Sequence, residues 1–361
     1  MTRIAVRETS VKPDSPSRGG HSVPPADSSN APAVAGPVRL PLPDAIVPGE
    51  IVWTYVIAIA GVHLLALLAI LPWTAGFLFS WTGLISMLVG VHVFGWGINL
   101  CYHRLLAHKS ATVPKWLERT FVVLALCCMQ DTPGKWVATH RYHHHHSDES
   151  ADPHSPLVAF LWAHVGWLLV RNRATQNVGT YRKFARDVLE DPFYLALELS
   201  TAWIWIYIGH ALLFFGAGFG VGWFAGGSAA SGLQFGLSLL VWGVFVRTVA
   251  VWHITWSVNS LTHLFGYANY ETGDHSKNNW FVGLIAAGEG WHNNHHHDPA
   301  SASNQHRWWE IDVIYYEILL LKAVGLATDV VPPKFRRDAA RAARSQTRGA
   351  VDVASVPNAI D

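Results

Sequence analysis

Two long stretches near the start of the chain contain no charged side chain, and they constrain the fold more than any other feature. Residues 51–72 and 76–100 lack Asp, Glu, Lys and Arg, and each exceeds the ~20 apolar residues that an α-helix needs to cross a bilayer. They are nearly contiguous, so a helical hairpin is expected. A second pair follows at residues 197–216 and 231–250, joined by a glycine-rich segment. The sequence therefore predicts an all-α membrane protein with four transmembrane helices in two hairpins.

Arg247 limits the fourth span, because a charge deep in a bilayer is costly. We expect the span to end near this residue and the helix to continue past the membrane. Asn259 and His263 are four residues apart, so they would then lie on one face of that helix.

The positions of Lys and Arg predict the orientation. Outside the spans these residues lie before residue 51, between 101 and 195, or after 276, and neither hairpin turn contains one. Positively charged loops are retained in the cytoplasm. Both termini and a helical cap between the hairpins are therefore expected on the cytoplasmic side of a multi-pass integral membrane protein.

The ends of the chain differ in composition from the middle. Residues 1–50 are rich in Pro, Ser, Gly and Ala and are predicted to be a disordered tail, because they contain too few large apolar groups to bury. Residues 331–361 contain a basic run and are predicted to be a flexible tail. The membrane domain is expected to cover residues 51–330.

The chain shows no redox or nucleotide module of its own. Its three cysteines, Cys101, Cys127 and Cys128, form no C-x-x-C motif, which excludes a cysteine-ligated iron–sulfur cluster. The sequence also lacks G-x-G-x-x-G and P-loop motifs. We expect no bound flavin or nicotinamide and no nucleic acid partner.

Nine of the 21 histidines form three spaced clusters and one outlier. They are His103 and His108; His140, His143 and His144; His263; and His292, His295 and His296. In H-x-x-H-H all three rings share one helix face, whereas H-x-x-x-x-H needs a helix end or a bend for its rings to converge. Two matching copies argue against a chance arrangement. The neighbours His145, His146 and His297 break the pattern and are expected to face solvent or to contact the ligands.

Such a set of neutral imidazoles suits transition metals. Nine ligands exceed the four of a structural zinc site and the three of a catalytic one. Two irons with open positions for O2 fit better, although the ligand type alone admits copper or manganese. A metal centre at the membrane face indicates oxidation of a molecule that resides in the membrane.

Four segments, in this order, resemble the histidine boxes of the integral-membrane delta-9 fatty acyl desaturases. They are HRLLAH, HRYHHHHSDESADPHSP, VNSLTHLFG and GEGWHNNHHH. The resemblance runs from about residue 50 to 330 and implies that the nine histidines ligate two irons. It also implies that Asn259 reaches one iron through water. The acyl chain would bend at the residues that match the family's tunnel, which are Gln130, Trp136, Thr255 and Trp256.

The resemblance implies an O2-dependent reaction that introduces a cis double bond into a saturated C16 or C18 acyl chain at the ninth carbon. An unactivated methylene has no useful acidity, so a metal-based oxidant must remove hydrogen. Two electrons must come from outside. The expected donor is a ferredoxin, rubredoxin or cytochrome with its reductase.

The carrier of the acyl chain stays open between CoA and a membrane lipid. Animal acyl-CoA enzymes have an Arg-Asp pair immediately before the second box, whereas this chain has Ala138 and Thr139. That sequence is more similar to bacterial and cyanobacterial enzymes, some of which act on lipid-esterified chains. A bacterial inner membrane is the expected location.

Three alternatives compete with this interpretation. A histidine-box hydroxylase of the alkane, carotenoid or sterol type would share the metals and spans but insert oxygen. A metal transporter would line a path across the bilayer, whereas most histidines here lie outside the predicted spans on one side. A lipid-binding protein without activity would have no need for the full ligand set.

Overall fold

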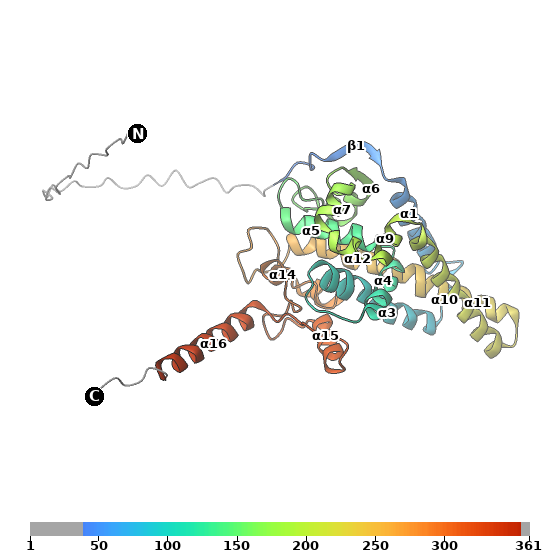
Figure 1. Ribbon diagram of the computed structural model, residues 1–361. Helices are drawn as coiled ribbons and strands as arrows, with labels where there is room; N and C mark the ends of the chain where they lie inside the picture. The colour runs from blue at the N-terminus through green and yellow to red at the C-terminus, as the bar shows by residue number, and fades with distance from the viewer. Residues whose placement is uncertain (1–38, 355–361) are drawn as a thin grey trace, which may run out of the picture. The chain divides into compact units, whose positions relative to one another are not determined.

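Three helices of the computed structural model are long and apolar enough to cross a membrane (Figure 1). The structure describes residues 39–354, with side chains as far as residue 344. The three helices are α3 with η1 (Trp81–Ala107), α10 (Ala202–Gly226), and the run from α11 to η4 (Ala229–His263). Only 11% of the most apolar 18-residue stretch of α10 is buried inside the protein. Such an exposed apolar surface requires lipid around it.

The first predicted span is shorter than expected. Helix α1 covers Trp53–Leu67, and a turn separates it from the short helix α2 (Ala75–Leu78). The hydroxyl of Thr74 donates to the carbonyl of Leu68 at 2.6 Å and closes this turn. The 15 residues of α1 rise ~22 Å, less than the ~30 Å hydrocarbon core. The prediction of one continuous helix over residues 51–72 is therefore wrong. Helices of membrane-crossing length occur at the other three predicted spans, although the third begins at Ala202 and not at residue 197.

The glycine-rich segment predicted as a loop is helical. It forms the end of α10 and the start of α11 (Ala229–Leu240), and the chain reverses at Gly227, whose φ is +67°. A Cβ at Gly218 would lie 3.0 Å from the Cα of Gly236, and one at Gly222 would lie 2.6 Å from the carbonyl oxygen of Ser231. The glycines are thus contact positions that let two membrane helices pack closely.

Replacing Gly222 by Ala should loosen this hairpin. The new methyl group would overlap the Ser231 carbonyl, and such overpacking costs about 1–3 kcal/mol of stability. Gly220 on the same helix faces open space, since a Cβ added there would meet nothing within 4 Å. Gly220→Ala is therefore the matched control and should be neutral or slightly stabilising. Thermal unfolding in detergent measures both, and equal melting temperatures for the two variants would contradict the packing argument.

Arg247 lies inside a continuous helix and does not face lipid. Segment η3 (Val241–Val246) leads directly into α12 (Arg247–Ser260), and the Arg247 side chain is fully buried. It donates to the carbonyls of Gly243 and Cys127 and to Nε2 of His210, and it lies 3.9 Å from the ring centre of Phe94. Because these groups solvate the charge, the span need not end at Arg247 as the sequence predicted.

Both tail predictions need correction at their inner ends. Strand β1 (Ile46–Ile51) pairs antiparallel with β2 (Val170–Asn172), so residues 46–50 are not a disordered tail. The backbone N–H of Lys334 donates to Asp298 at 2.7 Å, and Lys334–Ala354 forms helix α16 where a flexible tail was predicted. Residues 1–38 and 355–361 of the predicted tails lie outside the described residues.

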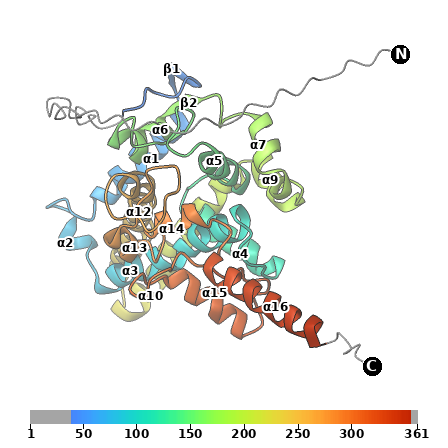
Figure 2. The ribbon, with the colours of Figure 1, turned by 90° about the vertical axis from the view of Figure 1, so that its left-hand side faces the viewer.

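The remaining helices form a layer beside the long helices (Figures 1 and 2). They are α4 (Lys115–Leu126), α5 (Pro133–His146), η2 (Trp162–Gly166), α6 (Trp167–Leu169), α7 (Val178–Phe184), α8 (Arg186–Leu189), α9 (Pro192–Leu199), α13 (Trp280–Ile285), α14 (His292–His297) and α15 (Val313–Ala323). A buried ion-pair network joins this layer to η1 (Trp96–Ala107): Arg104 contacts Glu289 at 2.8 Å and Asp312 at 2.9 Å. The network fixes the start of α14 against η1, where the histidines meet.

Candidate metal centre

The local helix geometry explains where the rings of each histidine box lie. In α5 and α14 the spacing i, i+3, i+4 places three rings on one face. The first box needs a different geometry, which η1 supplies as a π-helix. The backbone N–H of His108 donates to the carbonyl of His103 at 3.1 Å, the i to i+5 bond of that helix type. This bond brings the two rings together, and His108 is the residue at which η1 ends, so the predicted helix end is confirmed.

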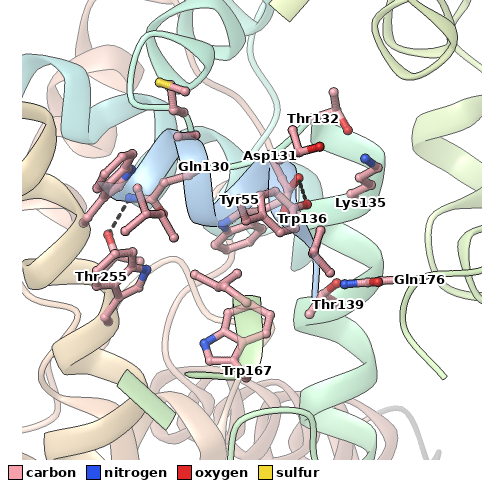
Figure 3. Close-up of a pocket in the computed structure, with 18 of the residues that line it drawn as sticks. Tyr55, Gln130, Asp131, Thr132, Lys135, Trp136, Thr139, Trp167, Gln176 and Thr255 are labelled. Carbon is pink, nitrogen blue, oxygen red and sulfur yellow. Dashed lines mark hydrogen bonds between the residues drawn. The ribbon is translucent and has the colours of Figure 1, made fainter. Parts of the chain in front are cut away.

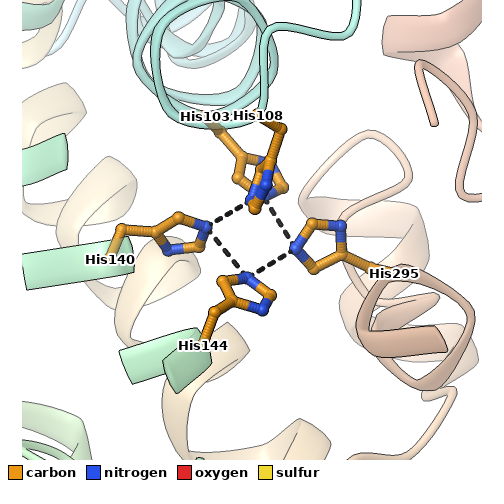
Figure 4. Close-up of side chains that lie close together, drawn as sticks. All are labelled: His103, His108, His140, His144 and His295. Atoms are coloured by element: carbon orange, nitrogen blue, oxygen red, sulfur yellow. Dashed lines mark hydrogen bonds between the residues drawn. The ribbon is translucent and has the colours of Figure 1, made fainter. Parts of the chain in front are cut away.

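Five of the nine predicted histidines form a first cluster (Figure 4). They are His103, His108, His140, His144 and His295, and the ligand nitrogens lie within 4.8 Å of one another. The Nε2 atoms of His108 and His140 are 2.7 Å apart, and those of His144 and His295 are 2.9 Å apart. Rings from η1, α5 and α14 thus point at a common centre.

The other four predicted histidines form a second cluster, which consists of His143, His263, His292 and His296. The Nε2 atoms of His263 and His292 are 3.1 Å apart. Nε2 of His296 is buried and has no hydrogen-bond partner among the described residues. A buried nitrogen lone pair without a partner is what a bound metal ion would satisfy. The structure therefore brings together all nine histidines and divides them five and four.

Four buried carboxylates, which the sequence patterns did not predict, contact the Nδ1 atoms of four clustered histidines. The Glu289 carboxylate lies 2.9 Å from Nδ1 of His103, and that of Asp152 lies 3.0 Å from Nδ1 of His143. The Asp148 carboxylate lies 2.7 Å from Nδ1 of His263, and that of Asp274 lies 2.6 Å from Nδ1 of His296. A carboxylate can only accept, so each Nδ1 donates and each Nε2 presents a lone pair to its cluster. Asp148 and Asp152 directly follow the second box in the sequence, which was an available signal.

Burial tunes these groups for metal binding. Removal from water lowers the pKa of His108, His140, His144, His292 and His295 well below the ordinary value. Their rings are neutral at pH 7, as a metal ligand must be. Burial alone would raise the pKa of Asp148, but the hydrogen bonds from His263, Ser155 and the backbone of His275, together with the charge of His263, lower the pKa of this carboxyl to about 2. Asp148 is therefore ionised when His263 donates to it.

The spacing of the nitrogens fits metal ions. Two ligands that are each ~2.1 Å from one ion and about 90° apart would lie about 3.0 Å from each other. The observed Nε2 separations are 2.7–3.1 Å. Lone pairs at this distance repel unless a cation lies between them, so both clusters are suited to hold one metal ion each.

A cavity of about 550 Å³ reaches the first cluster at His140. Figure 3 shows side chains that line this cavity. The predicted bend residues all line it: Gln130, Trp136, Thr255 and Trp256. Gln130 donates to the hydroxyl of Thr255 at 2.9 Å and bridges α12 to the loop before α5. The ring of Trp136 stacks on His140 at 4.9 Å between centres. Asn259 also lines the cavity, although no hydrogen bond to a described residue holds its side chain.

The cavity wall contains polar residues that sequence reasoning did not identify. The hydroxyl of Tyr55 on α1 contacts Asp131, and Lys135, Arg171 and His154 lie on the same wall. His154 packs against His143 with ring centres 4.3 Å apart. It follows His144, the last histidine of the second box, by ten positions, and its spacing matches no box.

The extra histidines lie outside both clusters. His145 is exposed and lies beside Phe184, with ring centres 6.0 Å apart. His146 contacts Glu149 at 3.2 Å, and His297 stacks on Tyr270. Their separation from the clusters agrees with the expectation that they face solvent or neighbouring side chains.

These features define a class: membrane-embedded helical proteins in which two histidine clusters lie together and a cavity reaches one of them. Within that class, the chain belongs to the fatty acid desaturase family, because the family model described as Fatty acid desaturase matches residues 79–319. The resemblance seen in the histidine boxes is thus confirmed. The protein is a fatty acyl desaturase, and the match does not favour the hydroxylase alternative.

Several relatives support the same family assignment. The chain is 40% identical over 282 residues to the sn-1 stearoyl-lipid 9-desaturase of Anabaena variabilis, covering 78% of this chain and 94% of the relative. It is 40% identical over 280 residues to the palmitoyl-monogalactosyldiacylglycerol delta-7 desaturase of Arabidopsis thaliana, covering 77% and 68%. The acyl-CoA 5-desaturase AL21 of Anemone leveillei is 39% identical over 280 residues, covering 77% and 79%.

Proposed function

We propose that this protein is a di-iron desaturase that introduces a cis double bond at the ninth carbon of a saturated C16 or C18 chain, using O2. The division of nine histidines into two buried clusters carries the proposal. We assign His103, His108, His140, His144 and His295 to one iron and His143, His263, His292 and His296 to the other. Asn259 would complete the second site through a water molecule.

The chain's own residues position the substrate. When bound, the irons would supply the oxidising power for removing two hydrogen atoms from neighbouring carbons. The cavity lies directly against His140 through the stacked ring of Trp136, so an acyl chain inside it passes the first cluster. The Gln130 and Thr255 bridge and the buried ring of Trp256 would hold the chain in one bent conformation. Such positioning selects which carbons react.

A lipid-linked acyl chain is the carrier we propose. Among the described residues that line the cavity, two carry a positive charge, Lys135 and Arg171. Asp131, which contacts Tyr55 of α1, also lines it. Two cations and one carboxylate provide little attraction for CoA, whose phosphates are strongly anionic. The Anabaena variabilis relative is named for a stearoyl-lipid substrate. The acyl-CoA name of the Anemone leveillei relative makes CoA the alternative.

The proposal includes the arrangement in the membrane. Helix α1 would be the fourth span, embedded together with the turn that follows it, and the histidine layer would form a cap on the cytoplasmic side. The termini would also lie in the cytoplasm, with a bacterial inner membrane as location. An external ferredoxin, rubredoxin or cytochrome with its reductase would supply two electrons.

Expression in a desaturase-deficient host that supplies a reductase system tests the proposed function. We expect a cis-9 monounsaturated C16 or C18 chain to accumulate in membrane lipids, at the expense of the saturated chain. Mass spectrometry after derivatisation of the double bond locates the bond, and supplying labelled stearoyl-CoA or stearoyl lipid to purified protein separates the carriers. A hydroxylated product, or an unchanged acyl profile with protein present, would refute the assignment.

A further inference from the structure

An aromatic stack at the surface connects solvent to one candidate metal ligand. His297 directly follows His296 of the second cluster, and its ring stacks on Tyr270 with centres 3.8 Å apart and planes 10° apart. The Tyr270 hydroxyl lies 2.9 Å from Nδ1 of His306. Tyr270 and His297 are both partly exposed, whereas the His296 side chain is only 2% exposed. The stack therefore links the surface to the buried cluster through one ring contact and one peptide unit.

Exposed cations lie on the segments near this stack, and one exposed carboxylate, Glu271, directly follows Tyr270 in the chain. Arg307, Lys334 and Arg336 are exposed, and no ion pair between described side chains ties any of them to a carboxylate. The nearby Asp298 is already held by Arg337 and by the backbone N–H of Lys334. Phe335, which is 46% exposed, lies beside His306 with ring centres 5.5 Å apart. A partly aromatic surface with a basic rim is the composition of a protein-binding site.

The position of the surface suits a soluble partner. Helices α14 and α16 lie at the opposite end of the described unit from the turn between α10 and α11 (Figures 1 and 2). That turn belongs to the exposed apolar hairpin that needs lipid around it. The Tyr270 and His297 stack thus points away from the part of the protein that is embedded most deeply.

We propose that Tyr270, His297, Arg307, Lys334 and Arg336 form the docking and electron-entry surface for a small acidic protein that carries one electron at a time. The proposal rests on the proposed function, because desaturation requires this supply. Two C–H bonds of the substrate break and one carbon–carbon π bond forms, which yields two electrons and two protons. Two carriers are each oxidised by one electron, and two further protons come from water. O2 receives all four electrons and four protons and leaves as two water molecules.

A second basic surface on α7 is the natural comparison. Arg182 and Lys183 are exposed there, and His145, the neighbour of His144, lies beside Phe184. The ring contact is weaker, with centres 6.0 Å apart and planes at 57°. Carboxylates also neutralise the surrounding cations, because Lys109 and Arg141 pair with Asp187 and Arg186 pairs with Glu190. The α7 surface therefore serves as a matched control.

Binding measurements on the metal-loaded protein test the docking surface. The probe is an acidic plant-type [2Fe–2S] ferredoxin, measured against protein in nanodiscs at several salt concentrations. The double variant Lys334→Glu/Arg336→Glu should weaken binding about tenfold at low salt and flatten its salt dependence. The control Arg182→Glu/Lys183→Glu should stay within about twofold of wild type. Loss of affinity in the α7 variant alone would overturn the proposal.

Tyr270 variants test the electron route separately from docking. At saturating ferredoxin, Tyr270→Leu should slow the reduction of the metal centre by bound ferredoxin about tenfold or more, because the ring stack is lost. Tyr270→Phe keeps the ring and should restore the rate. Equal reduction rates in Tyr270→Leu and wild type would overturn this route.

A small chemical reductant separates failure of the inference from failure of the proposed function. Wild-type protein and all variants should form unsaturated product in single turnovers with this reductant. If wild type forms none, the proposed function fails. If wild type forms product, but substitutions at Lys334, Arg336 and Tyr270 change neither ferredoxin binding nor ferredoxin-supported turnover, only the docking inference fails.

Discussion

Replacing His295 by Ala is expected to abolish product formation and to remove metal from the first site. Nε2 of His295 lies 3.1 Å from that of His103 and 2.9 Å from that of His144, so its loss opens one side of the cluster. Disturbing even a residue that supports a ligand costs 10–100-fold in activity or affinity, and loss of a ligand should cost about a hundredfold or more. Wild-type protein should contain about two irons per chain, and the variant about one.

His145→Ala is the control for this variant. His145 lies next to the candidate ligand His144 in sequence but is exposed and belongs to neither cluster. Its replacement should leave iron content unchanged and most of the activity intact. Elemental analysis and product quantification on both purified variants give the comparison. Full iron content in His295→Ala, or zinc as the metal that supports activity, would contradict the assignment.

Asp148→Asn is expected to weaken metal binding at the second site by about 10–100-fold while leaving the fold intact. The Asp148 carboxylate accepts from Nδ1 of His263 at 2.7 Å, from the backbone N–H of His275 at 2.9 Å and from the hydroxyl of Ser155 at 2.6 Å. Asn is nearly isosteric but carries no charge, so it orients and polarises His263 less strongly. An Asn backbone also tolerates the φ of +57° that Asp148 adopts.

Glu149→Gln provides the matched control, because Glu149 is exposed and its carboxylate contacts His146, which belongs to neither cluster. A chelator competition assay measures the affinity of each variant for iron, and circular dichroism checks helix content. We expect the control to retain wild-type affinity. Unchanged iron retention in Asp148→Asn would show that the carboxylate is dispensable for the second site.

Periodicity predicted the elements that hold the histidines, but not every boundary. The i, i+3, i+4 spacing correctly placed three rings on one face of α5 and again of α14. The glycine-rich stretch was misassigned, since isolated glycines signal a loop unless a neighbouring helix fills the space beside them. Here α11 does so against Gly218 and Gly222. The predicted end of the fourth span at Arg247 was wrong for a similar reason, because the buried partners of this side chain come from residues far away in the sequence.

The sequence by itself determined the chemistry of this protein. Charge-free helices, nine histidines at repeated spacing and the order of the boxes depend only on local periodicity and residue type, and they indicated the membrane setting, the family and all nine clustered histidines. Only the tertiary structure decided how those histidines divide into five and four and which carboxylates hold them. Glu289 and Asp274 reach their histidines across 186 and 22 positions of chain, and such contacts arise from packing, which local spacing does not encode.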